Sequence, residues 1–161
     1  MRNQLVAVTL TLLLALEAGA QNYKSLDVGC CISIETDHYP RNTWTLYDSA
    51  KDHWAYLDNK KQSDKSHQWK VKAKQGNIFQ FESVAFPGRC LCERTNLIVM
   101  YGGTCECRSA EPVQLWQLDG IERSQRVAFK RPNHSYYLYP CKNGLCLIID
   151  PHKFDWIVKP C

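Results

Sequence analysis

The sequence predicts an all-β domain that is exported and cross-linked by disulfides. Three observations lead to this fold class: short runs in which apolar and polar residues alternate, a threefold internal repeat that ends each time on a tryptophan, and nine cysteines that follow an N-terminal apolar segment. Alternation with a period of two is typical of half-buried strands, and no long amphipathic helix interrupts it.

The N-terminus has the order of a secretory signal peptide. A basic start is followed by an apolar run from Leu5 to Leu16 and by Ala18-Gly19-Ala20. The alternative, a membrane or buried helix, fits less well because a membrane span needs about 20 apolar residues. We therefore expect residues 1–20 to be removed and residues 21–161 to form one secreted domain without membrane insertion.

The mature part divides into three units, at roughly 30–74, 78–120 and 126–161. Each unit opens with an alternating strand, and these are Cys31–Glu35, Phe79–Ser83 and Val127–Lys130. Each continues with a leucine-centred strand, and the leucines are Leu46, Leu91 and Leu138. After a turn and a third strand, each unit closes on a tryptophan with an aliphatic residue two places later. The closing pairs are Trp69 with Val71, Trp116 with Leu118 and Trp156 with Val158.

Residues two positions apart lie on one face of a strand, so each closing pair is expected to point into a core. Three units of four strands predict a β-trefoil, which is a six-stranded barrel capped by three hairpins. A sandwich of two sheets is the alternative fold.

The cysteines fit this arrangement as disulfides, because thiols of exported domains are oxidised. In the middle unit, two Cys-x-Cys pairs fall on adjacent antiparallel strands, where one register satisfies both bridges. In the last unit, Asn143-Gly144 predicts a two-residue turn that sets two cysteines at a non-hydrogen-bonded pair. The first and last strands of a trefoil are neighbours. This brings the C-terminal cysteine close to the vicinal pair, Cys30 and Cys31. The expected bridges are Cys90–Cys107, Cys92–Cys105, Cys141–Cys146 and either Cys30 or Cys31 with Cys161.

One cysteine of the vicinal pair is then left over and could link two chains. Two Cys-x-Cys pairs could instead bind zinc, but export favours disulfides, and we expect neither a metal nor a cofactor. The sequon Asn133-His134-Ser135 makes Asn133 a candidate glycosylation site.

The middle unit resembles the ricin-type lectin trefoils. Gly88-Arg89-Cys90-Leu91 is similar to their glycine–basic–Cys-Leu strand, and Gln114-Leu115-Trp116 satisfies their Gln-x-Trp signature. Sugar binding in that family relies on an acidic residue just after the Cys-Leu pair. The positions that correspond here are Tyr47, Cys92 and Tyr139. The resemblance therefore implies the fold, without the usual acceptor for a simple sugar.

A second resemblance is to the interleukin-1 cytokines, which are also trefoils. The segment Phe81–Gly88, followed by Leu91-Cys92 and by Pro112-Val113, is similar to their signature segment. That segment lies near the end of those cytokines, whereas a whole further unit follows it here. This resemblance implies a ligand that recognises a receptor by protein contacts.

Basic residues alternate along the last strand of the first unit. Lys70, Lys72 and Lys74 share one face, and Trp69, Val71 and Ala73 are expected to take the inward face. Lys60 and Lys61 lie in the loop before this strand. The five lysines are either a solvated face that discourages edge aggregation or a docking stripe for sulfated glycans, whose binding would weaken with salt.

Tyr137 and Tyr139 are candidates for stacking on sugar rings. The histidines have no metal-type spacing, and the chain has no Gly-x-Ser-x-Gly elbow or phosphate loop. The formal net charge of +4 fits a partner with an acidic surface, and export argues against nucleic acid.

These observations predict a secreted, non-catalytic, lectin-like protein that binds extracellular glycan, including sulfated or other anionic glycan. The alternative is a cytokine-like or toxin-like ligand for a cell-surface receptor. A third interpretation, a protease inhibitor, needs an exposed rigid loop, and residues 93–104 are the longest candidate.

Overall fold

The computed structural model describes residues 26–47, 54–59, 64–95, 99–121, 125–144 and 146–161. The expected signal peptide lies outside these residues, as do Lys60 and Lys61. The described strands are β1 (Cys31–Glu35), β2 (Thr43–Thr45), β3 (Tyr56–Asp58), β4 (Trp69–Gln75), β5 (Ile78–Ser83), β6 (Arg89–Thr95), β7 (Met100–Glu106), β8 (Trp116–Asp119), β9 (Arg126–Lys130), β10 (Tyr137–Pro140), β11 (Leu147–Asp150) and β12 (Trp156–Pro160). Two short 3₁₀ turns, η2 (Lys65–His67) and η3 (Pro112–Gln114), precede β4 and β8. Among the described residues, no helix is long and apolar enough to cross a membrane.

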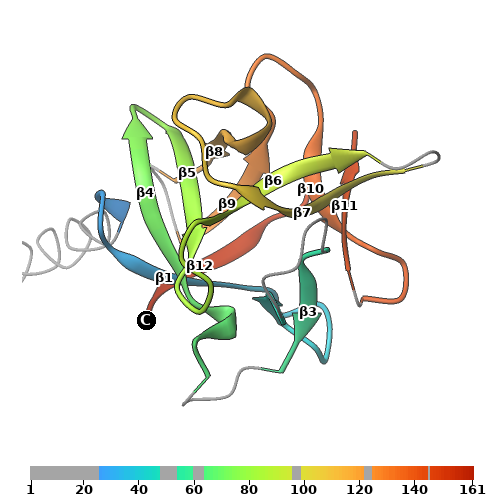
Figure 1. Ribbon diagram of the computed structural model, residues 1–161. Coiled ribbons are helices and arrows are strands. Elements are labelled where there is room, and N and C mark those ends of the chain that lie inside the picture. Colours follow the sequence, from blue (N-terminus) through green and yellow to red (C-terminus); the bar gives the residue numbers. More distant parts are fainter. Residues whose placement is uncertain (1–25, 48–53, 60–63, 96–98, 122–124, 145) are drawn as a thin grey trace, which may run out of the picture.

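The strands that open and close the three units form a closed barrel. β1 pairs with β4, β4 with β5, β5 with β8, β8 with β9, β9 with β12, and β12 returns to β1. The remaining strands form the hairpins β2–β3, β6–β7 and β10–β11. Figure 1 shows β1 and β12, from the two ends of the chain, side by side. This closed ring with three hairpins confirms the predicted trefoil, and the sandwich alternative is wrong because a sandwich has open sheet edges.

The three closing tryptophans occupy equivalent positions in the core. All three indoles are fully buried. Each indole N–H donates to a backbone carbonyl of the second strand of its own unit. The bonds run from Trp69 to Trp44 at 3.3 Å, from Trp116 to Leu91 at 3.2 Å and from Trp156 to Leu138 at 2.9 Å. The hydrogen bonds therefore mark the threefold repeat directly.

These bonds also correct the alignment of the first unit. The residue equivalent to Leu91 and Leu138 is Trp44 and not Leu46, because Trp44 holds the carbonyl that the closing indole reaches. β2 accordingly ends at Thr45. The position after it that corresponds to the lectin acid is Thr45 and not Tyr47, so no unit has a carboxylate there.

The β4–β5 ladder differs from a regular alternation. Its register shifts between Val71 and Ala73, which marks a β-bulge. Trp69 and Val71 point into the core as expected, but Ala73 is exposed. The expectation that Ala73 faces inward is wrong, because the bulge adds a residue and re-aims the side chains beyond it.

Four disulfides link the strands. They are Cys31–Cys161, Cys90–Cys107, Cys92–Cys105 and Cys141–Cys146. These are pairings that the sequence leads us to expect, with Cys31 rather than Cys30 as the partner of Cys161. The register behind the middle pair differs, however. The β6–β7 ladder sets Cys90 opposite Cys105, so both bridges run diagonally to a residue two places along.

The hairpin turn before β11 also differs from the sequence expectation. The Gly144 N–H donates to the Cys141 carbonyl at 2.7 Å, so Lys142 and Asn143 are the central turn residues. The Cys141 N–H donates to the Cys146 carbonyl at 2.9 Å, which makes these cysteines a hydrogen-bonded pair. Gly144 has a φ of 65°, a value that glycine adopts without strain.

Candidate binding site in the middle unit

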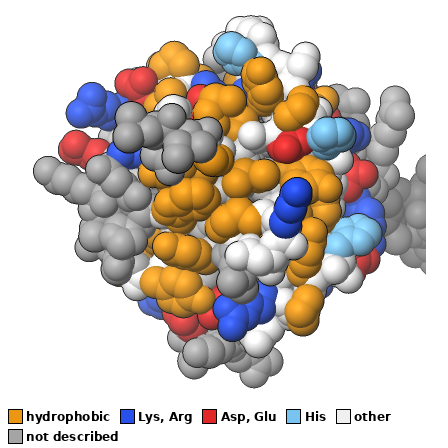
Figure 2. Space-filling view, turned by 90° about the vertical axis from the view of Figure 1, so that its right-hand side faces the viewer, with side chains coloured by type: hydrophobic (Ala, Val, Ile, Leu, Met, Phe, Trp, Pro, Cys, Tyr) orange, Lys and Arg blue, Asp and Glu red, His pale blue; other side chains and the backbone are white. Residues whose placement is uncertain are grey.

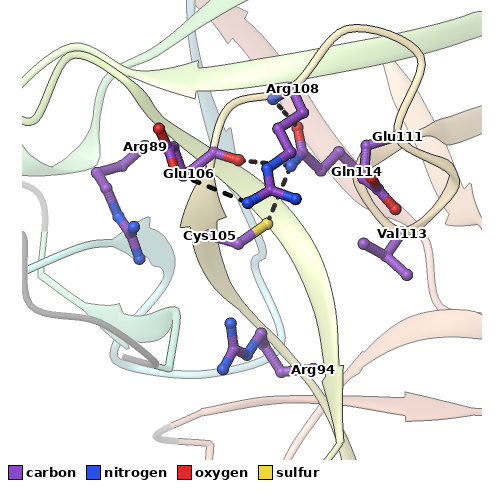
Figure 3. A pocket seen from close by; sticks show the side chains of 8 residues that line it. All are labelled: Arg89, Arg94, Cys105, Glu106, Arg108, Glu111, Val113 and Gln114. Atoms are coloured by element: carbon purple, nitrogen blue, oxygen red, sulfur yellow. Dashed lines mark hydrogen bonds and ion pairs between the residues drawn. The ribbon is translucent and has the colours of Figure 1, made fainter.

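A pocket of about 420 Å³ opens in the middle unit. It lies between the β6–β7 hairpin and the segment that leads through η3 to β8. Its lining residues are Arg89, Arg94, Cys105, Glu106, Arg108, Glu111, Val113 and Gln114. Figure 3 shows the arginines around the cavity, with Arg94 entering from the side opposite Arg108. The pocket therefore combines several cations with a small apolar wall at Val113.

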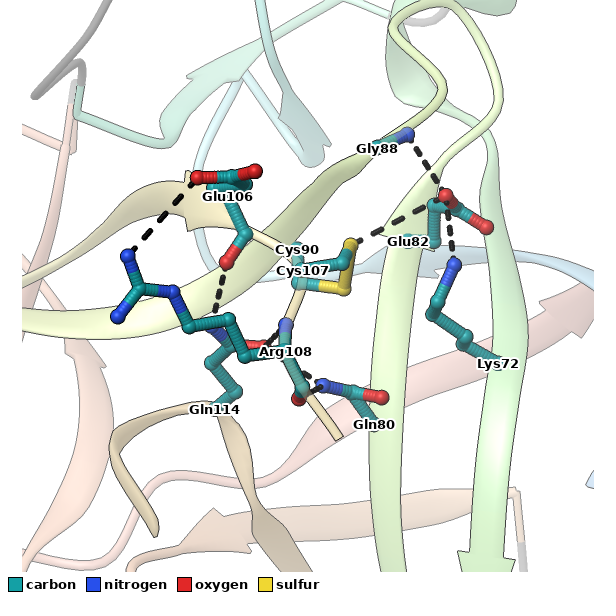
Figure 4. Close-up of polar contacts among 9 residues, drawn as sticks. All are labelled: Lys72, Gln80, Glu82, Gly88, Cys90, Glu106, Cys107, Arg108 and Gln114. Carbon is teal, nitrogen blue, oxygen red and sulfur yellow. Dashed lines mark hydrogen bonds and ion pairs between the residues drawn. A yellow bond between two sulfur atoms is a disulfide. The ribbon is translucent and has the colours of Figure 1, made fainter. Parts of the chain in front are cut away.

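Gln114 fixes the shape of this pocket. It is the glutamine of the Gln-x-Trp signature and is 2% exposed. Its amide oxygen accepts from the Arg108 backbone N–H at 3.0 Å and from Gln80 Nε2 at 2.6 Å. Its amide nitrogen donates to the Glu106 carbonyl at 2.7 Å and to Cys105 Sγ at 3.3 Å. Figure 4 shows this side chain between the end of β7 and β5. One buried amide thus ties together the chain segments that carry the pocket's charges.

Two of the three arginines lie on β6, and the third follows β7. Arg89 begins β6 and donates to the Thr104 carbonyl at 3.1 Å. Arg94 is half-buried near the end of the same strand. Arg108 follows β7 and lies 3.9 Å from the Glu106 carboxylate, where both side chains are exposed. A guanidinium presents a planar fork of donors, which matches the two oxygens of a carboxylate or the oxygens of a sulfate.

A disulfide occupies the position that the lectin resemblance assigns to an acidic residue in this unit. Cys92, at the position after the Cys-Leu pair, is fully buried and bonded to Cys105. The sulfur of Cys105 lines the pocket and accepts from Gln114. Guanidinium groups are therefore the main charged donors around this cavity.

A second polar cluster lies behind the pocket, on β5. Glu82 accepts from Lys72 Nζ at 3.0 Å and from the Gly88 N–H at 2.7 Å (Figure 4). Burial by itself raises the pKa of Glu82, but the Lys72 ammonium and the Gly88 N–H outweigh it and hold the pKa below its usual value. Glu82 is therefore ionised and pairs with one lysine of the expected stripe.

The basic stripe is partly neutralised in the structure. Lys72 pairs with Glu82, and Lys74 lies 2.8 Å from the Asp27 carboxylate. Lys70 is exposed at the start of β4. Lys74 also borders a smaller cavity of about 270 Å³ whose walls include Phe79 and Leu115. Acidic partners from other segments thus lower the positive potential that the sequence alone suggests for this face.

The two candidate tyrosines lie elsewhere, on β10. Both are half-buried, and the Tyr139 ring meets Phe154 edge to face at 5.4 Å. β4 and β10 lie on opposite sides of the molecule in Figure 1. The structure therefore does not bring the lysines and the tyrosines into one site.

The other expected features are placed as follows. Asn133 is exposed in a turn with a φ of 63°, where its side chain points to solvent. In the expected loop 93–104, residues 93–95 belong to β6 and residues 100–104 to β7, while residues 96–98 lie outside the described residues. Among the described residues, no three His, Cys, Asp or Glu side chains gather as a metal site requires.

Sequence reasoning missed the arginine pocket. Arg89 stands within the lectin-like motif, but Arg94 and Arg108 follow no period. The one sequence signal that points to this pocket is the glutamine of the Gln-x-Trp signature. A buried amide needs hydrogen-bond partners, so it indicates that another chain segment folds back against it.

No protein-family model matches the chain, and no curated protein is similar to it in sequence. Solved structures do resemble it. The fold is a β-trefoil. A mosquitocidal holotoxin structure matches with a TM-score of 0.65 and 14% identity, over 83% of this chain and 17% of that chain. The cytolethal distending toxin of Haemophilus ducreyi matches with a TM-score of 0.60 and 14% identity, over 81% and 83% of the two chains.

A structure described as the BEL β-trefoil matches with a TM-score of 0.60 and 12% identity, over 84% of this chain and 95% of that one. The chain spans only a small part of the holotoxin. At identities of 12–14% this likeness is one of fold.

Proposed function

We propose that the protein is a secreted, non-catalytic binding module of lectin-like type that recognises extracellular glycans carrying a negative charge. One observation carries the proposal, the pocket lined by Arg89, Arg94 and Arg108 beside Gln114. Three guanidiniums face two glutamates there, and one of these, Glu106, already lies beside Arg108. The excess of positive charge in the lining favours a ligand that places an anionic group in the pocket.

The geometry of the pocket, as well as its charge, favours an anionic ligand. Arginine forks bind planar carboxylates with two parallel hydrogen bonds, and they lose less solvation than an ammonium does. The disulfide at Cys92 removes the acceptor that a neutral sugar would use, so the pocket offers donors in its place. An acidic sugar supplies the complementary acceptors. The four disulfides are compatible with an extracellular location.

The test is a glycan array that includes sialylated, sulfated and neutral sugars, probed with the oxidised mature protein at low and high salt. The variant Arg94→Gln/Arg108→Gln removes two charges from the pocket. The variant Lys70→Gln/Lys74→Gln removes two charges from the stripe on β4 and is the matched control. We expect salt-sensitive binding to acidic glycans that the arginine variant loses and the lysine variant keeps. The opposite pattern would assign binding to the lysine stripe and contradict the pocket.

A second candidate function is a toxin-like or cytokine-like ligand for a cell-surface receptor. Two solved structures that share the fold are toxins by their descriptions, and the chain exposes large apolar side chains such as Tyr47 and Tyr136. A silent array, together with cell binding that survives enzymatic removal of surface glycans, would favour this function over the first.

A further inference from the structure

A row of side chains crosses four strands beside the arginine pocket. In the ladders, Arg94 of β6 lies opposite Tyr101 of β7, Tyr101 opposite Ile148 of β11, and Ile148 opposite Tyr139 of β10. Residues directly opposite one another project from the same face of a sheet. With strands about 4.8 Å apart, the row extends for about 14 Å. It starts at a residue that lines the pocket.

Aromatic contacts hold Tyr101 and Tyr139 of the row in place. Trp54 lies flat on Tyr101, with the ring centroids 4.0 Å apart and the planes 8° from parallel. Backbone pairing fixes Trp54 there, since it forms a β-bridge with Gly103 and the next N–H, that of Ala55, donates to the Gly102 carbonyl at 2.9 Å. At the β10 end of the row, Tyr139 packs against Phe154. The row is therefore preorganised.

Three members of the row reach solvent and one does not. Tyr101 is covered, with 5% exposure, but Trp54, Ile148 and Tyr139 each remain partly exposed. Figure 2 shows apolar side chains gathered over the middle of this side of the molecule. An apolar strip that ends at a cationic pocket is complementary to a ligand with one charged end and an uncharged, partly apolar body.

An oligosaccharide with a single acidic end has this form. Its neutral rings carry C–H faces that stack on aromatic side chains, and tyrosine and tryptophan combine such faces with polar edges. We propose that the exposed side chains of this row, which are Ile148, Tyr139 and the Trp54 ring that covers Tyr101, form an extended subsite. This subsite binds the neutral sugars next to an acidic sugar held in the arginine pocket. This inference rests on the proposed function and names its ligand class.

The experiment compares short and long sugars with the same acidic group. N-acetylneuraminic acid is paired with 3′-sialyllactose, and galactose 3-sulfate is paired with 3′-sulfolactose, so that carboxylate and sulfate are distinguished. Affinities for the oxidised mature protein are measured by calorimetry. We expect the longer member of at least one pair to bind about tenfold more tightly.

Variants separate the row from the pocket. Trp54→Ala should lower the affinity for the longer sugar to that for the short sugar, and it should leave the affinity for the short sugar unchanged. Ile148→Lys should have the same effect on the two affinities. Because Ile148 is partly exposed, this variant still tests the row if the Trp54 variant fails to fold. Arg94→Gln should weaken both members of the pair. Tyr136→Ala, at an exposed tyrosine that is not a member of the row, is the matched control.

The outcomes distinguish the two proposals. If the short acidic sugars bind and the longer ones bind no better, the row is not a sugar subsite, while the pocket stands. If no acidic sugar binds at all, the proposed function itself is contradicted. If the protein dimerises in sedimentation experiments and Ile148→Lys abolishes the dimer, the row is occupied by a second copy of the chain and the subsite is overturned.

Discussion

Arg131 and Glu93 form an ion pair of 2.6 Å between two units of the trefoil. The two side chains are 7% and 20% exposed. Arg131 follows β9 in the third unit, whereas Glu93 lies on β6 in the middle unit. The same guanidinium donates to the Leu115 carbonyl at 3.1 Å and lies 5.7 Å from the Trp116 ring. One arginine thus anchors the segment that carries Gln114 and the pocket wall.

Replacing Arg131 by leucine should destabilise the protein strongly. Breaking a buried ion pair leaves an uncompensated charge, which costs about 3–5 kcal/mol. The free energy of unfolding, measured with urea, gives the value. The control is Arg126→Leu, which breaks an Arg–carboxylate pair with Asp37 at the exposed surface and should change stability little. Equal effects of the two variants would contradict the structural role given to Arg131.

The indole N–H groups of the three closing tryptophans should contribute similar amounts to the free energy of unfolding. Trp69→Phe, Trp116→Phe and Trp156→Phe each leave a buried carbonyl of the second strand without its donor, and we expect each to cost about 1–3 kcal/mol. Urea unfolding of the three variants is the measurement. Trp54→Phe, which changes a partly exposed indole, should cost less than any of them. If one of the three variants left the free energy of unfolding unchanged, the three tryptophans would not be equivalent.

The lowered pKa of Glu82 should make the folded protein less stable in acid. Because its pKa in the folded protein is below the unfolded value, its ionisation stabilises the fold above the unfolded pKa. That contribution is lost as the pH falls through the folded pKa. The difference in unfolding free energy between wild type and Glu82→Gln should therefore shrink as the pH is lowered from 6 towards 3, with thermal unfolding as the readout. A constant difference would contradict the ion pair with Lys72.

The repeat could be read from the sequence because core positions alternate and each unit ends on tryptophan. The register of the first unit could not. Trp44 and Leu46 are both fully buried, and a shift of two residues leaves every side chain on the same face. The hydrogen bond from Trp69 to the Trp44 carbonyl distinguishes the two registers, and the pairing of Trp44 with Leu57 of β3 agrees with it.

The candidate site was less accessible to sequence reasoning for a related reason. The lysines of β4 are conspicuous because they alternate, but the acids that pair with Lys72 and Lys74 come from β5 and from the segment before β1. The arginines become neighbours only when η3 folds back on the β6–β7 hairpin around Gln114. Charge pairing and pocket formation are tertiary effects, and local periodicity contains neither.

The disulfides should differ in their contribution to stability according to the chain length that they close. Cys31–Cys161 spans 130 residues, and Cys141–Cys146 spans 5. A cross-link stabilises mainly by restricting the unfolded chain, which gives about 5 kcal/mol for the long loop and about 2 kcal/mol for the short one.

The variants Cys31→Ser/Cys161→Ser and Cys141→Ser/Cys146→Ser test this difference by urea unfolding. Both are made in a Cys30→Ser background, so that the vicinal cysteine cannot replace Cys31, and the background protein is the reference. The long-range pair should cost more because it joins β1 to the end of the chain beside β12, where the barrel closes. An equal or smaller cost would mean that the ladder between β1 and β12 already holds the two ends together in the unfolded ensemble.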